Sequence, residues 1–361
     1  MIRPPEHIQS IKPYVPGKPV EELQRELGIE DAVKLASNEN PLGPSPKAVE
    51  AVYKVISRLN RYPDGSAFYL KNALSEKLAV RPEGLIIGNG SNELIDIAVR
   101  TFMTAGDEAI MGMPSFVVYP MAVQSVGAKA VQVPLKEWRH DLDAMAGEIT
   151  ERTRIIFVAN PNNPTGTINH TDEFDEFMHR VPDGVLVIVD EAYREYVQDC
   201  RYPDAMEYLK AGRDILILRT FSKVYGLAGL RIGYGISREE IVREMNKVRE
   251  PFNTSSVAQA AAIASVGDSG HVERSIALNE EGKAYLYKEF RSLGLDFVAT
   301  EANFIYVGFD RPVELYNHLL KMGVIIRPIG AAAVRITVGL PEENRLLVEA
   351  LGAVIGKILI S

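Results

Sequence analysis

Short apolar runs separated by turn-forming segments dominate residues 84 to 237. They are rich in Ile and Val and do not alternate strictly with polar residues, which is typical of strands buried on both faces. The seven runs are GLIIG (84–88), EAIMG (108–112), AKAVQV (128–133), RIIFVAN (154–160), GVLVIVD (184–190), ILILRT (215–220) and RIGYGI (231–236). Helical patterns lie between several of them, at 92–102, 115–126 and 172–181. This alternation predicts an α/β fold with a mostly parallel seven-stranded sheet and helices on both faces.

The two ends of the chain have different patterns. Residues 1–45 are rich in proline and turn residues and predict an extended N-terminal arm. From about residue 250 onward, long helical patterns surround three further apolar runs, at 302–309, 323–329 and 333–339. We therefore expect a large domain over 46–250 and a smaller α+β domain over 251–361, with the arm packed against the smaller one.

Composition narrows the function classes. The net charge of −8 argues against a nucleic-acid-binding protein, which usually carries a basic surplus. No apolar run reaches membrane-spanning length, and the first residues lack the apolar core of a signal peptide. The single cysteine, Cys200, cannot form an intrachain disulfide, which favours the cytoplasm. The six histidines show no ligand spacing, so we expect no metal site.

Polar residues follow the ends of these runs, where ligands bind in open α/β sheets. The segment GNGSNE (88–93) opens a helix and is either a phosphate site or an ordinary capped turn. It matches the dinucleotide motif GxGxxG only in part, because Glu93 takes the third glycine position. A nicotinamide oxidoreductase would rest on this segment alone. In NPNNPTG (160–166) the prolines and glycine predict a rigid turn whose asparagine amides can donate to a ligand.

The next two runs end in charged residues. Asp190, in DEAY (190–193), follows six apolar residues, and a buried carboxylate there is costly unless a cation or several donors meet it. Lys223, in TFSK (220–223), stands at the end of another buried strand. Loss of hydration favours its neutral amine, the form that attacks aldehydes. Taken singly, each residue also has an ordinary structural explanation.

Together these segments resemble the fold-type-I pyridoxal-phosphate aminotransferases over nearly the whole chain. The motifs that carry the resemblance are SNENPLGPSP (37–46), RYPDG (61–65), GNGSNE, NPNNPTG, DEAY and TFSKVYGLAGLRIGYG (220–235). They look most like the subgroup that acts on histidinol phosphate. The resemblance implies a homodimer in which L-glutamate and imidazole acetol phosphate exchange an amino group, giving L-histidinol phosphate and 2-oxoglutarate in histidine biosynthesis.

The resemblance also implies the roles of individual residues around pyridoxal 5′-phosphate. Lys223 would bind the cofactor aldehyde and move the proton at the substrate Cα, and Asp190 would pair with the pyridine nitrogen. Asn163 and Tyr193 would hydrogen-bond the phenolic oxygen, and Phe116 would stack on the ring. The residues that match the phosphate site are Ser91, Asn92, Ser222 and Arg231, with Tyr62 reaching across the dimer interface.

Substrate contacts complete the set that the resemblance implies. Arg335 matches the arginine that forks onto a carboxylate. The other matching positions are Tyr14, Asn40, Asn163 and Arg327. The segment between the two arginines, PIGAAAV, is shorter than in many family members, which leaves the reach of Arg327 open. An aromatic amino-acid aminotransferase is the main alternative, and a pyridoxal-phosphate decarboxylase is a more distant one.

Overall fold

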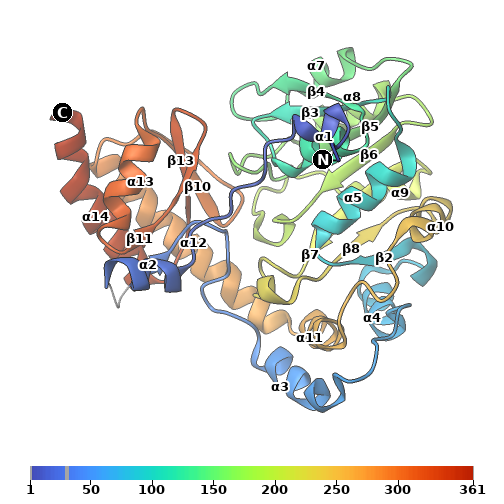
Figure 1. The fold of residues 1–361 in the computed structure, drawn as a ribbon, viewed down its shortest axis with the longest axis horizontal. Helices are drawn as coiled ribbons and strands as arrows, with labels where there is room; N and C mark the ends of the chain where they lie inside the picture. Colours follow the sequence, from blue (N-terminus) through green and yellow to red (C-terminus); the bar gives the residue numbers. More distant parts are fainter. Residues whose placement is uncertain (1, 29–31, 361) are drawn as a thin grey trace.

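The seven predicted strands form one sheet in the computed structural model, which describes residues 2–28 and 32–360 (Figure 1). The strands are β2 (Leu85–Gly88), β3 (Glu108–Met113), β4 (Lys129–Pro134), β5 (Thr153–Ala159), β6 (Leu186–Asp190), β7 (Ile215–Thr220) and β8 (Gly233–Ile236). They are ordered β2-β8-β7-β6-β5-β3-β4. All neighbours from β7 to β4 are parallel, and β8 is antiparallel to both β2 and β7. The predicted mostly parallel sheet is confirmed.

Two hydrophobic cores cover the two faces of this sheet, because successive side chains of a strand point to opposite faces. In β2, Ile86 belongs to one core, and Leu85 and Ile87 belong to the other. The first core includes α5 (Ser91–Phe102), α6 (Val118–Ser125) and α10 (Glu239–Val248). The second includes α3 (Pro46–Val55), α4 (Phe68–Leu78), α7 (Leu142–Gly147), α8 (Thr171–Arg180), α9 (Ala205–Lys210) and α11 (Ser256–Val266). The helical patterns at 92–102, 115–126 and 172–181 correspond to α5, α6 and α8.

A smaller antiparallel sheet lies beside the large one. Its order is β12-β13-β10-β9, formed by β9 (Phe297–Val298), β10 (Phe304–Gly308), β12 (Arg327–Ile329) and β13 (Ala333–Thr337). A third core packs it against α12 (Ser269–Ser292), α13 (Pro312–Leu320) and α14 (Pro341–Ile360). The predicted run 323–329 is divided, because β11 (Val324–Ile325) pairs with an N-terminal strand and β12 pairs with β13.

The N-terminal arm connects the two groups of elements (Figure 1). It contains α1 (Glu6–Gln9), α2 (Val20–Leu27) and β1 (Val33–Lys34). Strand β1 pairs with β11, and Leu23 of α2 packs against Ala36 and Ile325. At the other end, Gln124 Nε2 of α6 donates to Ser10 Oγ at 2.6 Å, just after α1. The arm therefore spans the space between the two sheets before it reaches the first predicted boundary.

The predicted boundaries at 45 and 250 stay predictions, and α11, which follows the second, packs into a core of the large sheet. Short 3₁₀ turns occur at η1 (Ile56–Arg58), η2 (Pro82–Gly84), η3 (Arg194–Tyr196) and η4 (Ala228–Leu230).

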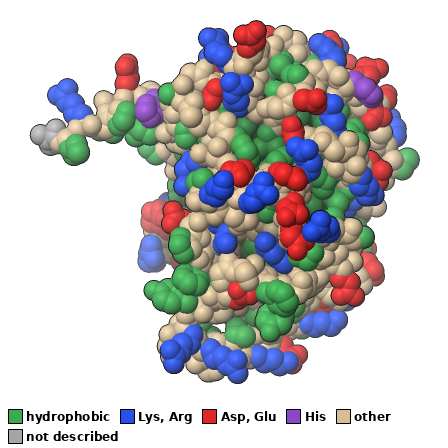
Figure 2. Space-filling model, turned by 90° about the vertical axis from the view of Figure 1, so that its right-hand side faces the viewer, with side chains coloured by type: hydrophobic (Ala, Val, Ile, Leu, Met, Phe, Trp, Pro, Cys, Tyr) green, Lys and Arg blue, Asp and Glu red, His purple; other side chains and the backbone are tan. Residues whose placement is uncertain are grey.

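Figure 2 shows acidic and basic side chains side by side over much of one face. None of the described helices has an apolar stretch of the length that a bilayer crossing requires.

Candidate active site

A cavity of about 210 Å³ opens at the carboxyl ends of β5, β6 and β7. Its walls come from the large sheet, the small sheet and the arm. Most of the predicted site residues line it: Tyr14, Ser91, Asn92, Phe116, Asn163, Asp190, Tyr193, Ser222, Lys223, Arg231, Arg327 and Arg335. The parallel strands bring these distant residues together, because their carboxyl ends meet at one edge of the sheet.

Lys223 follows β7 and lies in the wall of this cavity. Its Nζ donates to the carbonyl oxygen of Ser37 at 3.3 Å and lies 5.5 Å from the centroid of the Tyr193 ring. Burial lowers the pKa of Lys223 to about 7, and the positive charges of Arg335 and Arg231 act in the same direction. A much larger share of this amine is therefore neutral at pH 7 than of an exposed lysine, and the neutral amine is the nucleophilic form.

Asp190 is the last residue of β6, and its side chain is buried. Its Oδ2 accepts a hydrogen bond from the Tyr119 hydroxyl at 2.8 Å, and its Oδ1 accepts one from the Ala192 amide at 3.2 Å. Burial raises the pKa of Asp190, whereas both hydrogen bonds and the charge of Lys223 oppose that rise. The carboxylate is thus held in a fixed position beside the cavity, where a cationic ring nitrogen would compensate its burial.

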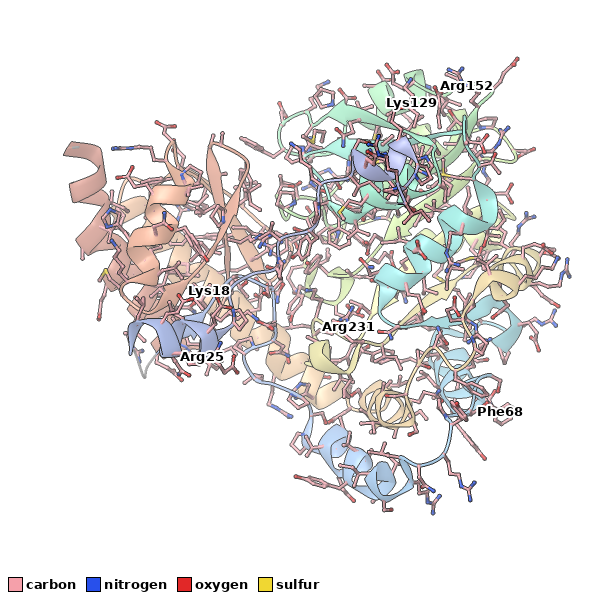
Figure 3. All side chains as sticks on the ribbon, viewed as in Figure 1. Lys18, Arg25, Phe68, Lys129, Arg152 and Arg231 are labelled. Atoms are coloured by element: carbon pink, nitrogen blue, oxygen red, sulfur yellow. The ribbon has the colours of Figure 1, made fainter. Side chains whose placement is uncertain are left out.

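The N-terminus of α5 lies beside the guanidinium of Arg231. Gly90 precedes the helix at φ +76°, and no side chain caps the first turn. Arg231 Nη1 donates to Ser222 Oγ at 3.4 Å and to the Ala228 carbonyl at 3.1 Å. Arg231 is labelled near the middle of the view in Figure 3, and its side chain is exposed. Free backbone N–H groups, a hydroxyl and a guanidinium together suit a phosphate group.

Two arginines from the small sheet also line the cavity, Arg327 in β12 and Arg335 in β13. Arg335 donates from Nη1 to Asn163 Oδ1 at 2.6 Å and from Nη2 to the Ala36 carbonyl at 2.7 Å. Its Nε is buried and has no protein partner. Arg327 donates to the Val15 carbonyl at 2.7 Å, and its guanidinium lies 5.3 Å from the centroid of the Tyr14 ring. Both arginines therefore face the cavity while the arm and Asn163 hold them.

Two predicted site residues lie outside this cavity. The Asn40 amide donates to the Val224 carbonyl at 2.7 Å and to Ser275 Oγ at 2.8 Å, so it fixes the backbone behind Lys223 rather than facing a substrate. Tyr62 is 83% exposed and stacks on Phe252, with ring centroids 4.8 Å apart. A contact of Tyr62 with a cofactor would have to come from a second chain.

Two residues that the sequence did not single out also line the cavity, Asn38 and Tyr119. Asn38 Nδ2 donates to the Tyr193 hydroxyl at 2.8 Å, and its backbone has φ +56°. Nothing in SNEN (37–40) distinguishes this asparagine from Asn40. A signal for Tyr119 did exist, because it follows Phe116 by three residues within the predicted helix 115–126, and residues three apart share a helix face.

The side chains of the cavity fit pyridoxal phosphate in charge and in kind. Four basic side chains line it, Lys223, Arg231, Arg327 and Arg335, together with the carboxyl group of Asp190. An amine for the aldehyde, a carboxylate for the ring nitrogen and an anion site for the phosphate all occur on this one surface.

Fold and site together define a fold-type-I aminotransferase that depends on pyridoxal phosphate. The chain belongs to the family "Aminotransferase class I and II", whose model matches residues 30–351. It is 52% identical to a histidinol-phosphate aminotransferase of Moorella thermoacetica, over 96% of this chain and 91% of that protein. It is 46% identical to histidinol-phosphate aminotransferase 1 of Nitrosococcus oceani, over 96% of this chain and 95% of that protein.

Solved structures agree with the sequence relatives. The histidinol-phosphate aminotransferase of Sinorhizobium meliloti, crystallised in complex with pyridoxal-5′-phosphate, superposes with a TM-score of 0.92 and 28% identity, covering 99% of both chains. The aspartate aminotransferase of Thermus thermophilus with maleate has a TM-score of 0.84 at 22% identity, and shows the shared fold. The oxidoreductase alternative, which rested on GNGSNE alone, does not agree with this family.

Proposed function

We propose that this chain is a histidinol-phosphate aminotransferase that transfers the amino group of L-glutamate to imidazole acetol phosphate, giving L-histidinol phosphate and 2-oxoglutarate. The observation that carries the proposal is the pair of arginines, Arg327 and Arg335, that line the same cavity as Lys223. One substrate of this reaction carries a phosphate and the other carries carboxylates. Guanidinium groups bind both kinds of anion in a bidentate manner, so one site can serve both halves of the reaction.

The protein residues have distinct tasks in this reaction. Pyridoxal phosphate, when bound, supplies the electron sink that makes the substrate Cα acidic. Lys223 Nζ acts first as the base that removes the proton from the substrate Cα and then as the acid that donates a proton. A pKa near 7 suits both tasks. Asp190 would hold the ring nitrogen, and Phe116 would contact the ring face. Asn163 and Tyr193 would donate to the phenolic oxygen, and the start of α5 with Ser222 and Arg231 would bind the phosphate. Arg335 and Arg327, with Tyr14, orient the substrate.

A substrate panel tests the proposal. Specificity constants are measured for L-histidinol phosphate and L-phenylalanine with 2-oxoglutarate as the acceptor, in wild type and in Arg327→Met. We expect histidinol phosphate to be preferred. The variant should lose about 10-fold or more for histidinol phosphate and much less for phenylalanine, because phenylalanine has no phosphate. A clear preference for phenylalanine would instead support the aromatic aminotransferase.

We further propose a cytoplasmic homodimer whose two active sites each use Tyr62 of the partner. The support is a group of exposed aromatic side chains near Tyr62 in the sequence, namely Tyr53, Phe68 and Tyr69. Exposed apolar groups of this kind commonly mark a protein interface. The cytoplasm is favoured because the only cysteine, Cys200, is free.

Subunit mixing tests the shared site. A Tyr62→Ala chain and a Lys223→Ala chain are each expected to have little activity. After mixing and subunit exchange, about half of the dimers contain one of each, and each of these has one intact site, so about a quarter of wild-type activity should return. If no activity returns although mixed dimers form, Tyr62 does not act across an interface. Sedimentation of the wild type reports the dimer itself, and cell fractionation reports the location.

A further inference from the structure

The hydroxyl of Tyr119 is a buried polar group that packing alone does not explain. The residue is completely buried, and its ring stacks on Phe157 with centroids 4.6 Å apart and an angle of 11° between the planes. A phenylalanine would provide this contact equally well. The hydroxyl adds the polar contact with Asp190 Oδ2 at 2.8 Å. Burying a hydroxyl is unfavourable unless it has such a partner. The contribution of the hydroxyl group is therefore its hydrogen bond to Asp190.

Tyr119 also contacts the aromatic residue proposed to stack on the cofactor. Its ring meets Phe116 edge to face, with centroids 5.5 Å apart and an angle of 84°. One rigid side chain at the start of α6 thus contacts both Phe116 and Asp190. The Ala192 amide holds the other carboxylate oxygen. The carboxylate is therefore fixed at both oxygens, by two different elements of the fold.

We propose that Tyr119 is a positioning residue for the cofactor, which holds Asp190 ionised and correctly oriented toward the ring nitrogen. This inference rests on the proposed use of pyridoxal phosphate at this site. The hydrogen bond from the phenol is stronger to the carboxylate than to the carboxylic acid, because it is then assisted by charge. It opposes the effect of burial, which on its own would favour the protonated acid.

Other charged and titratable groups also face Asp190, and they set the background for a pH experiment. They are Glu191 and Tyr193 on its own segment and Lys223 after β7. Glu191 raises the pKa of Asp190 and Lys223 lowers it. Replacing Tyr119 by phenylalanine leaves these groups in place and removes a single oxygen atom. The pKa of Asp190 should then rise, and the carboxylate should be lost at a higher pH than in the wild type.

The experiment measures the dissociation constant of pyridoxal phosphate from the cofactor-free protein between pH 5 and pH 8, by absorbance or fluorescence titration. In Tyr119→Phe we expect binding about 10-fold weaker at neutral pH. Binding weakens as the pH falls, and we call this part of the profile the acid limb; its midpoint should lie about one pH unit higher in the variant. The matched control is Tyr202→Phe. It also removes a tyrosine hydroxyl at this sheet edge, from a half-buried side chain that donates to the Asn160 carbonyl and, at 3.4 Å, to Glu191 Oε1 rather than to Asp190. Its acid limb should match that of the wild type.

A double-mutant comparison separates positioning from packing. In Asp190→Asn no ionised carboxylate remains, so adding Tyr119→Phe should not move the acid limb any further. An unchanged acid limb in Tyr119→Phe, or an equal shift in the Asp190→Asn background, would overturn the inference. Failure of the wild type to bind pyridoxal phosphate would instead overturn the proposed function, so the two failures are distinguishable.

Discussion

The pH at which Lys223 loses its proton is the most direct test of the electrostatics of this cavity. Burial and two nearby arginines lower the pKa of its amine to about 7, against a usual value of 10.5. With that pKa, the neutral fraction is about 0.09 at pH 6, about 0.5 at pH 7 and about 0.9 at pH 8. An ordinary lysine amine increases its neutral fraction about 10-fold with each of these steps. The pH dependence of the neutral fraction therefore differs most between Lys223 and an ordinary lysine above pH 7.

Trace labelling of the cofactor-free protein with acetic anhydride measures how the neutral fraction of Lys223 depends on pH. The extent of acetylation at Lys223 is read by mass spectrometry at each pH, and N-acetyl-lysine amide is labelled separately as an example of an ordinary lysine amine. We expect labelling to rise about fivefold from pH 6 to pH 7, and less than twofold from pH 7 to pH 8. Removal of one contributing charge, in Arg335→Met, should move the midpoint upward. A tenfold rise per pH unit up to pH 9 at Lys223 would refute the argument that burial depresses its pKa.

Three substitutions test other parts of the molecule. Lys223→Ala should leave a folded protein that transaminates about 10³-fold more slowly, because the acid–base group is gone, and a rate above a tenth of wild type would contradict its role. Arg219→Met should lower the free energy of unfolding by about 3 kcal/mol in urea titrations, because it removes the buried partner of the Glu191 carboxylate at 2.8 Å and leaves only the longer ion pair with Arg194 at 3.6 Å. A change below about 0.5 kcal/mol would show that the pair contributes little. Gly226→Ala should lower the unfolding free energy by more than about 1 kcal/mol, measured by thermal melting, because φ is +69° and the added Cβ would lie 2.1 Å from the Gly43 carbonyl oxygen.

The large sheet could be predicted because its strands are buried on both faces. Such strands are continuous apolar runs, and their ends coincide with changes in composition that can be read directly from the chain. The small sheet was harder, because the run 323–329 looks like one strand. The structure divides it after Ile325, where β11 ends beside β1 of the arm and Arg327 begins a strand in a different sheet. That choice depends on a contact with a segment almost 300 residues earlier.

Most of the cavity could be predicted for a related physical reason. Parallel strands collect their carboxyl ends at one edge, so a polar residue that directly follows a buried strand, such as Asp190 or Lys223, is brought to that edge by the topology alone. Residues on irregular backbone have no such rule. In SNEN the left-handed conformation of Asn38, at φ +56°, determines which asparagine lines the cavity and which one, Asn40, turns away toward Val224.

The glycines around Arg231 connect the local backbone to the chemistry of the site. A Cβ at Gly90 would lie 2.6 Å from Arg231 Nη2, and a Cβ at Gly233 would lie 2.5 Å from the amide nitrogen of Ser91. Both distances are too short for a side chain, so glycine at these two positions allows the guanidinium and the start of α5 to approach each other. Arg231 itself has φ +54°, a conformation that is unfavourable for a residue with a Cβ. Such a strained conformation persists only where the surrounding structure stabilises it. Here the left-handed conformation of Arg231 turns the chain between Lys223 and β8, so that the guanidinium reaches the start of α5. The glycine-rich segment after Lys223 thus lets a single loop bring both Lys223 and Arg231 to the wall of the cavity.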